Sequence, residues 1–92
     1  MRRIRWSPAA ADDLEELFNY LKEHHPSLAQ PTIRKLYEAA RSLKRFPHRG
    51  HIGHNEGTRE LIVAPMPYII VYGVEPQVVS IFRVLHTSRE RK

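Results

Sequence analysis

The segment from residue 58 to residue 86 constrains the fold most, because it predicts three consecutive β-strands. Apolar and β-branched residues dominate residues 58–63, 67–72 and 78–86. Two breaks separate these runs: Pro65-Met66-Pro67 interrupts the first pair, and residues 73–77 turn the second pair. Residues 68–72 are apolar without alternation, which is typical of a central strand covered on both faces.

Two amphipathic helices precede these strands. Ser7 and Pro8 predict the start of the first helix, since serine is a natural N-cap and proline is tolerated at the first helical position. Pro26 predicts the end of this helix at about His24, because helices usually end before a proline. Between these limits an apolar stripe has helical spacing: Leu14, Leu17, Phe18 and Leu21.

The second helix begins just after Pro26. Ser27 and Gln30 fit a capping box, in which Ser27 is the N-cap and Gln30 reaches back to it. Phe46 and Pro47 close the helix, and its apolar stripe consists of Ile33, Leu36, Tyr37, Ala40 and Leu43. We expect the two helices to form an antiparallel hairpin whose apolar faces need a cover.

A short alternating strand at residues 2–6 completes the order strand, helix, helix, strand, strand, strand. We therefore expect an α+β fold, with one domain over residues 1–92. The helical hairpin packs on one face of a small, twisted, mostly antiparallel sheet, and the other face is concave and partly polar. Residues 47–57 are expected to form the main loop.

Composition excludes several classes of protein. The chain has no cysteine, so it can form neither disulfides nor thiolate metal sites. No apolar run approaches the ~18 residues that span a bilayer, and the N-terminus lacks the apolar core of a signal peptide. We therefore expect a cytoplasmic protein that uses no cofactor and contacts no membrane.

The net charge of +5 is unevenly distributed. Acids gather in the first helical segment: Asp12, Asp13, Glu15, Glu16 and Glu23. From residue 24 to residue 55 the only acid is Glu38, against six arginines and lysines: Arg34, Lys35, Arg41, Lys44, Arg45 and Arg49. This basic element can meet nucleic acid or an acidic protein segment, or it can be a solvated helix face.

Cationic side chains also lie at or near the ends of the predicted strands. Arg59 is either solvent-facing, paired with a carboxylate, or an anion contact through its planar fork of donors. His86 ends the last strand, where it is either a hydrogen-bonded structural residue or a group for acid–base work near neutral pH. Arg89 lies in the tail, where solvation is the default.

Arg83 is the sharpest case, because it lies inside a predicted strand. Alternation places it on the same face as Ile81 and Leu85. A buried charge without a partner is costly. We therefore expect Arg83 either to lie on the open face of the sheet or to pair with an acid such as Glu60.

Three histidines lie in the glycine-rich loop: His48, His51 and His54. A spacing of three in such a loop does not fix a ligand geometry, and no cysteine or aspartate supports them. Glu56 is the only acid nearby in sequence. We therefore expect no metal site.

Taken in order, several short motifs resemble the ParE/RelE superfamily of bacterial toxins. They are Trp6-Ser7-Pro8 with Ala10 and Asp13-Leu14, Tyr20-Leu21, Leu43 with Phe46-Pro47 and Gly50, Thr58-Arg59-Glu60-Leu61, Pro67-Tyr68-Ile69-Ile70 with Tyr72, and Val84-Leu85-His86-Thr87-Ser88-Arg89. The resemblance covers nearly the whole chain. It implies a helical hairpin on a twisted sheet and a plasmid-stabilisation type of toxin neutralised by a small antitoxin. It also implies toxin dimers or a heterotetramer with two antitoxins, and contacts to antitoxin or target through Arg59, Arg83, His86 and Arg89.

The superfamily divides by target. RelE-like members are ribosome-dependent mRNA endonucleases, in which equivalents of Arg59 and Arg83 bind phosphate while other groups transfer protons. This chain has no lysine between Lys44 and Lys92, and Thr87 follows His86 where an aromatic residue is expected. ParE-like members instead poison DNA gyrase, and the strand at residues 68–72 and the ending at residues 85–89 resemble that branch more closely.

The principal expectation is therefore a gyrase-inhibiting toxin that is not an enzyme. The alternative is an mRNA endonuclease acting on the ribosome with a reduced active site. Its catalytic candidates would be Arg59, Arg83 and His86, with Glu56 or Glu60 as the base. An inactive member or an unrelated nucleic-acid-binding module is the third possibility.

Overall fold

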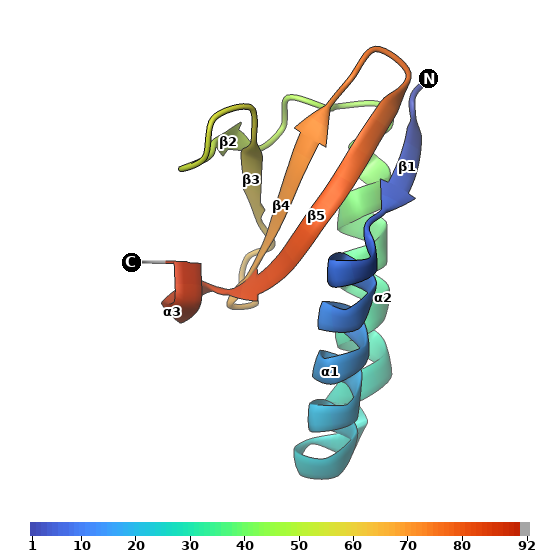
Figure 1. Ribbon diagram of the computed structural model, residues 1–92. Coiled ribbons are helices and arrows are strands. Elements are labelled where there is room, and N and C mark those ends of the chain that lie inside the picture. Colours follow the sequence, from blue (N-terminus) through green and yellow to red (C-terminus); the bar gives the residue numbers. More distant parts are fainter. Residues whose placement is uncertain (91–92) are drawn as a thin grey trace.

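The computed structural model describes residues 1–90, with side chains as far as Ser88. Five strands and three helices follow one another along the chain (Figure 1): β1 (Arg3–Trp6), α1 (Pro8–His24), α2 (Pro26–Ser42), β2 (His51–Ile52), β3 (Arg59–Ile62), β4 (Tyr68–Val74), β5 (Val78–His86) and α3 (Thr87–Glu90). Two of them, β2 and α3, lie where the sequence predicted irregular structure. Neither of the long helices in the described residues is long and apolar enough to cross a membrane.

The strands form one sheet in the order β1-β5-β4-β3-β2. The first strand, β1, and the last strand, β5, pair in parallel, and the other three pairs of strands are antiparallel. This confirms the prediction of a mostly antiparallel sheet in an α+β fold. The unexpected strand β2 is only two residues long and pairs with the start of β3, so its existence depends on a partner that local sequence does not reveal.

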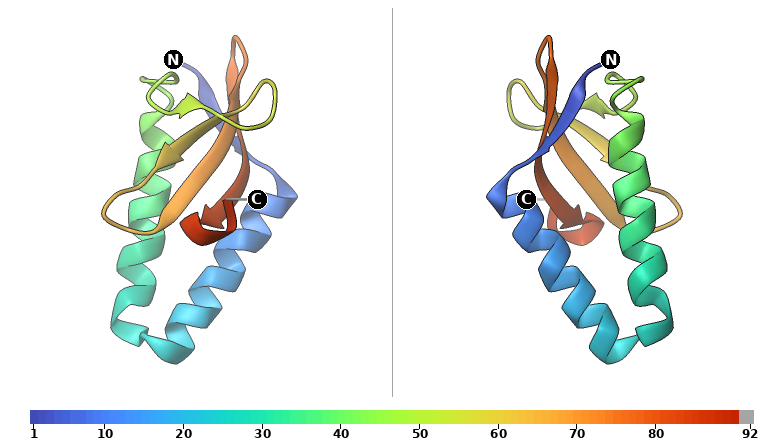
Figure 2. Two further views of the ribbon diagram at one scale, coloured as in Figure 1. Left: turned by 90° about the vertical axis from the view of Figure 1, so that its left-hand side faces the viewer. Right: turned by 90° about the vertical axis from the view of Figure 1, so that its right-hand side faces the viewer.

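The helices α1 and α2 lie together on one side of the sheet (Figure 2). The Ser7 hydroxyl caps α1 by accepting a hydrogen bond from the Ala10 N–H at 3.0 Å, as predicted. The predicted capping box of α2 is wrong. His25 alone connects the helices and is the N-cap of α2 without a side-chain bond, so Ser27 lies inside the helix. The reason is that the fixed φ of Pro26 suits the first helical position.

The hydrophobic core lies between the helical hairpin and one face of the sheet. Its buried side chains come from both helices and from β3, β4 and β5: Ala10, Leu14, Leu36, Ala40, Leu43, Leu61, Ile70, Tyr72, Val79, Ile81 and Val84. One residue of the predicted stripes, Tyr37, is less buried than expected and remains 47% exposed. Its ring packs edge-on against Trp6 of β1, with 5.1 Å between the ring centroids.

A β-bulge interrupts the pairing of β4 and β5. Residues 71 and 72 of β4 face Arg83 and Ile81, so Phe82 is the extra residue on β5. The alternation of β5 therefore changes at this point: Ile81 and Val84 are both in the core, whereas Arg83 is exposed. The prediction that Arg83 shares a face with Ile81 is wrong for this reason, whereas Arg83 and Leu85 both follow the bulge and lie on one face.

Candidate functional site

Arg83 is held by a carboxylate of α1. Its Nε donates to Asp13 Oδ2 at 2.8 Å and its Nη2 donates to Asp13 Oδ1 at 3.0 Å, which makes a two-pronged ion pair. The hydrogen bond to Asp13 raises the pKa of the Arg83 guanidinium. The acid that pairs with Arg83 is therefore Asp13, and the expectation of Glu60 is wrong.

Asp13 also protects the edge of β5. Strand β1 ends at Trp6, so β5 has no neighbouring strand beyond Ile81 on that side. The chain passes directly into α1, whose side chains occupy this edge. Asp13 Oδ2 accepts the Val84 N–H at 2.9 Å, and the Ser7 hydroxyl donates to the Phe82 carbonyl at 2.9 Å. The Asp13–Arg83 pair is therefore one of the contacts through which side chains bind the backbone groups at the unpaired edge of β5.

Arg59 is used to hold the loop that follows α2. Its Nε donates to the Gly50 carbonyl at 3.0 Å, and its Nη2 lies 3.5 Å from the His48 carbonyl. The hydroxyl of Tyr72, which is fully buried, donates to the Pro47 carbonyl at 2.8 Å and accepts the Gly50 N–H at 2.9 Å. The Arg59 guanidinium, for which an anion contact was one prediction, is therefore already bound to backbone oxygens.

Gly50 permits this close approach of loop and sheet. A Cβ atom at residue 50 would lie 2.6 Å from the Glu60 carbonyl oxygen and 2.8 Å from the Tyr72 hydroxyl. No side chain fits there without moving the backbone of β3. Arg59 and Tyr72 therefore hold the loop against the sheet. The absence of a side chain at Gly50 allows the loop to come this close.

His86 lies at the end of β5 beside an open hollow. Its Nδ1 lies 2.9 Å from the Ser88 hydroxyl and accepts the Ser88 N–H at 3.1 Å. Its ring packs edge-on against Tyr68 at 5.7 Å. Burial, and to a smaller extent the neighbouring Tyr20, raise the pKa of Tyr68.

The hollow itself has a volume of about 470 Å³, and its wall combines carboxylates with aromatic rings: Asp13, Glu16, Leu17, Tyr20, Tyr68, Val84 and His86. Two residues that were predicted to contact a partner, Arg83 and His86, are exposed near it. The side chain of Arg89, the fourth such residue, lies outside the described part of the chain.

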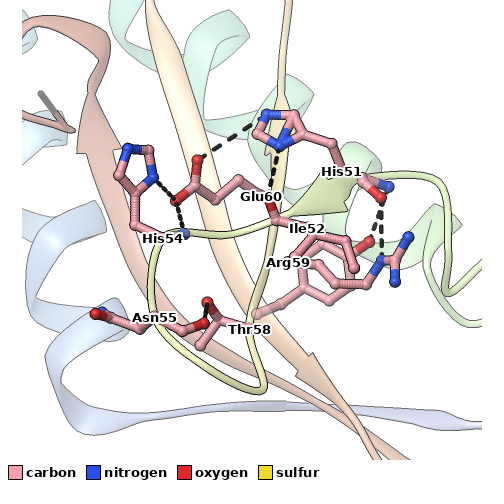
Figure 3. A network of polar contacts seen from close by, with 9 residues as sticks. His51, Ile52, His54, Asn55, Thr58, Arg59 and Glu60 are labelled. Carbon is pink, nitrogen blue, oxygen red and sulfur yellow. Dashed lines mark hydrogen bonds and ion pairs between the residues drawn. The ribbon is translucent and has the colours of Figure 1, made fainter.

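A second polar cluster surrounds Glu60, and the sequence did not predict it. The Glu60 side chain is only 6% exposed, while His51 and His54 above it are 55% and 66% exposed. Figure 3 shows the two imidazoles on either side of the carboxylate. His54 Nδ1 lies 3.2 Å from Glu60 Oε2, and His51 Nε2 lies 4.0 Å from Oε1. A carboxylate paired with an accessible imidazole can exchange a proton with a ligand.

The turn between β2 and β3 builds this cluster. His51 and Glu60 are direct cross-strand partners, and the His54 N–H also donates to Glu60 Oε2 at 3.3 Å. A Cβ atom at Gly53 would lie 2.5 Å from Thr58 Oγ1 and 3.2 Å from the Thr58 carbonyl oxygen, so a side chain there would displace Thr58. The signal in the sequence was the placement of His51 and Glu60 on either side of a glycine-rich turn. Among residues 1–90 no three His, Cys, Asp or Glu side chains are placed to hold a metal ion together.

The predicted cations do not converge on one point. Arg59 binds backbone carbonyls, Arg83 binds a helix carboxylate, and His86 binds the first turn of α3. Each therefore supports a different junction of the fold. The two histidines beside Glu60 are both more than half exposed.

Residues 4–91 match the family described as the ParE toxin of type II toxin–antitoxin systems, parDE. The chain belongs to the ParE toxin family. The toxin RelE2 of Caulobacter vibrioides is 36% identical to this ParE-family chain over 89 residues, which are 97% of the chain and 99% of the relative. These matches confirm the resemblance to the ParE/RelE superfamily.

Solved structures agree with this assignment. The chromosomal ParDE system from P. aeruginosa contains a chain that superimposes with a TM-score of 0.83 at 20% identity, covering 94% of this chain and 96% of that one. The toxin–antitoxin complex RelBE2 from Mycobacterium tuberculosis gives a TM-score of 0.68 at 25% identity, covering 92% and 96%. The ParE-family chain is thus a type II toxin whose relatives carry both ParE and RelE names.

Proposed function

We propose that this toxin acts by inhibiting DNA gyrase. One observation carries the proposal: Arg59, Arg83 and His86, the groups that an mRNA nuclease would use, are bound to separate partners within the fold. Stabilising the charge of a phosphoryl transition state requires donors that converge on one oxygen and are free to bind it. Here the guanidinium of Arg83 is already neutralised by Asp13.

A supercoiling assay tests the proposal. Purified toxin is added to gyrase and relaxed plasmid, and supercoiled product is followed on a gel. We expect the product to fall as toxin rises, and to return when the cognate antitoxin is added first. Full supercoiling at a large molar excess of folded toxin contradicts the proposal.

A cognate antitoxin is the second partner that we propose. The net charge of +5 favours an acidic segment, and such segments commonly fold on binding. Arg83 and His86, which remain exposed at the end of β5, are the predicted contacts that such a segment can reach. Arg83→Ala with His86→Ala should weaken antitoxin binding in a titration calorimeter, whereas unchanged affinity excludes this surface.

An mRNA endonuclease on the ribosome remains the second candidate function, and the Glu60 cluster favours it. His54 Nδ1 is 3.2 Å from the Glu60 carboxylate and the imidazole is accessible. In this geometry the carboxylate and the imidazole can act together as a general base. Translating ribosomes exposed to toxin should then yield mRNA cut in the A site, and His54→Ala should abolish the cut. Intact mRNA with the unmodified toxin eliminates this alternative.

A further inference from the structure

The start of β1, the end of α2 and the turn between β4 and β5 meet at one end of the molecule, opposite the tip of the helical hairpin (Figure 2). Two hollows of about 370 and 490 Å³ lie there, and both are lined by Lys44 and Arg45. Arg41 lines the first hollow and Arg2 lines the second. We call these four cations the basic end.

The basic end carries an excess of positive charge that the fold leaves uncompensated. The only acid that lines the two hollows is Glu38. Within residues 1–90, the three cations Arg41, Lys44 and Arg45 form no ion pair. Arg2 is oriented by a bond from its Nε to the Glu75 carbonyl at 2.7 Å, which neutralises no charge.

Three arginines outside the basic end have evident structural duties. Arg83 binds Asp13, Arg59 binds backbone carbonyls, and Arg5 Nη2 donates to the Ser80 hydroxyl at 2.9 Å. Arg41 complements the negative end of the α2 dipole, being in its last turn. Lys44 and Arg45 lie in the turn that directly follows the helix, and within the described residues neither forms an ion pair.

The arrangement of the basic end suits a row of phosphates. Its cations come from the residue before β1, from α2 and from the turn after α2, so they are spread over a surface rather than gathered around one point. Arginine forks bind phosphate oxygens through two donors. An amphipathic acidic peptide would also need a row of apolar contacts. The apolar residues lining the two hollows are only Met1, Phe46 and Pro76.

We propose that the basic end binds the phosphate backbone of duplex DNA. This property goes beyond gyrase inhibition, since it requires no gyrase, and it would bring the toxin to the substrate on which gyrase acts. Four phosphate contacts predict a slope of about −3.6 in a plot of log K against log salt, since each contact contributes about −0.9. Affinity should therefore fall about 150-fold between 50 and 200 mM salt.

Fluorescence anisotropy with a labelled duplex of mixed sequence tests the proposal on the full chain. Lys44→Gln with Arg45→Gln should reduce the slope to about −1.8, because two phosphate contacts are lost. The matched control is Arg34→Gln with Lys35→Gln, which removes the same charge from exposed positions in the middle of α2. The control should keep the slope of the unmodified toxin, and circular dichroism confirms that both variants are folded.

Three results would overturn the proposal. The first is an equal loss of slope in both double variants, which indicates attraction by net charge alone. The second is tighter binding to polyglutamate or to an RNA duplex than to duplex DNA. The third is no measurable binding to DNA at 50 mM salt. Because gyrase is absent from this experiment, none of these results bears on gyrase inhibition.

Discussion

Replacing Asp13 should destabilise the toxin mainly through the edge of β5. Asp13 accepts three hydrogen bonds, two from Arg83 and one from the Val84 N–H. The ion pair is partly solvated, because the Arg83 side chain is 46% exposed, so we assign it no more than about 1 kcal/mol. Losing the acceptor of the Val84 N–H costs about 1–2 kcal/mol, because Val84 is buried. Asp13→Ala should therefore cost about 2–3 kcal/mol.

Two further variants separate these contributions. Asp13→Asn keeps an oxygen for the Val84 N–H, but it removes the charge and replaces the oxygen that accepts from Arg83 Nη2 with an amide NH2, so it should cost about 1 kcal/mol. Arg83→Ala removes the same pair from the other side and should cost a similar amount. In both variants the strand edge remains satisfied.

The free energy of unfolding is measured by urea titration. The single tryptophan, Trp6, reports on the junction of β1 and α1 through its fluorescence. If the slope of the free energy of unfolding against urea concentration is unchanged, the variants alter stability and not the compactness of the unfolded chain. If Arg83→Ala is as costly as Asp13→Ala, the ion pair dominates and our account of the strand edge is wrong.

Two other predictions concern the packing of the loop and of the hollow. Gly50→Ala should cost about 3 kcal/mol in the same titration, because the new Cβ meets the Glu60 carbonyl and the Tyr72 hydroxyl, whereas Gly57→Ala, at φ +81° in open space, should cost about 1 kcal/mol. Equal costs would contradict the close approach at residue 50. The raised pKa of Tyr68 means that stability present below about pH 10, the ordinary tyrosine pKa, is lost as the pH rises towards the folded value. Tyr68→Phe should remove this loss, and an unchanged dependence of stability on pH in the variant would refute the assignment.

The sequence predicted the elements whose determinants are local. The Ser7 cap and the apolar stripes of both helices depend on residues within a few positions of one another, and the structure places these elements as expected. The prediction for α2 failed at its end, since the helix stops at Ser42 and not at Phe46-Pro47, and at its first turn. There two local signals competed, and the proline at residue 26 determined the helix start in place of the serine at residue 27.

The candidate site could not be predicted in the same way. Asp13 and Arg83 are separated by 70 residues, and their pairing depends on a strand edge that exists only because β1 is short. The bulge at Phe82 is a property of how β5 pairs with β4, so alternation in β5 alone gives the wrong face for Arg83. The Glu60 cluster likewise depends on the pairing of β2 with β3.

Inhibition of gyrase supercoiling by the purified toxin tests the central claim most directly. A titration with the unmodified toxin and with Arg83→Gln should give inhibition in both cases, because Arg83 serves the fold in this account and not catalysis. The variant should differ only where its lower stability leaves it partly unfolded. Full supercoiling with the folded, unmodified toxin, together with mRNA cut on the ribosome, would contradict the claim.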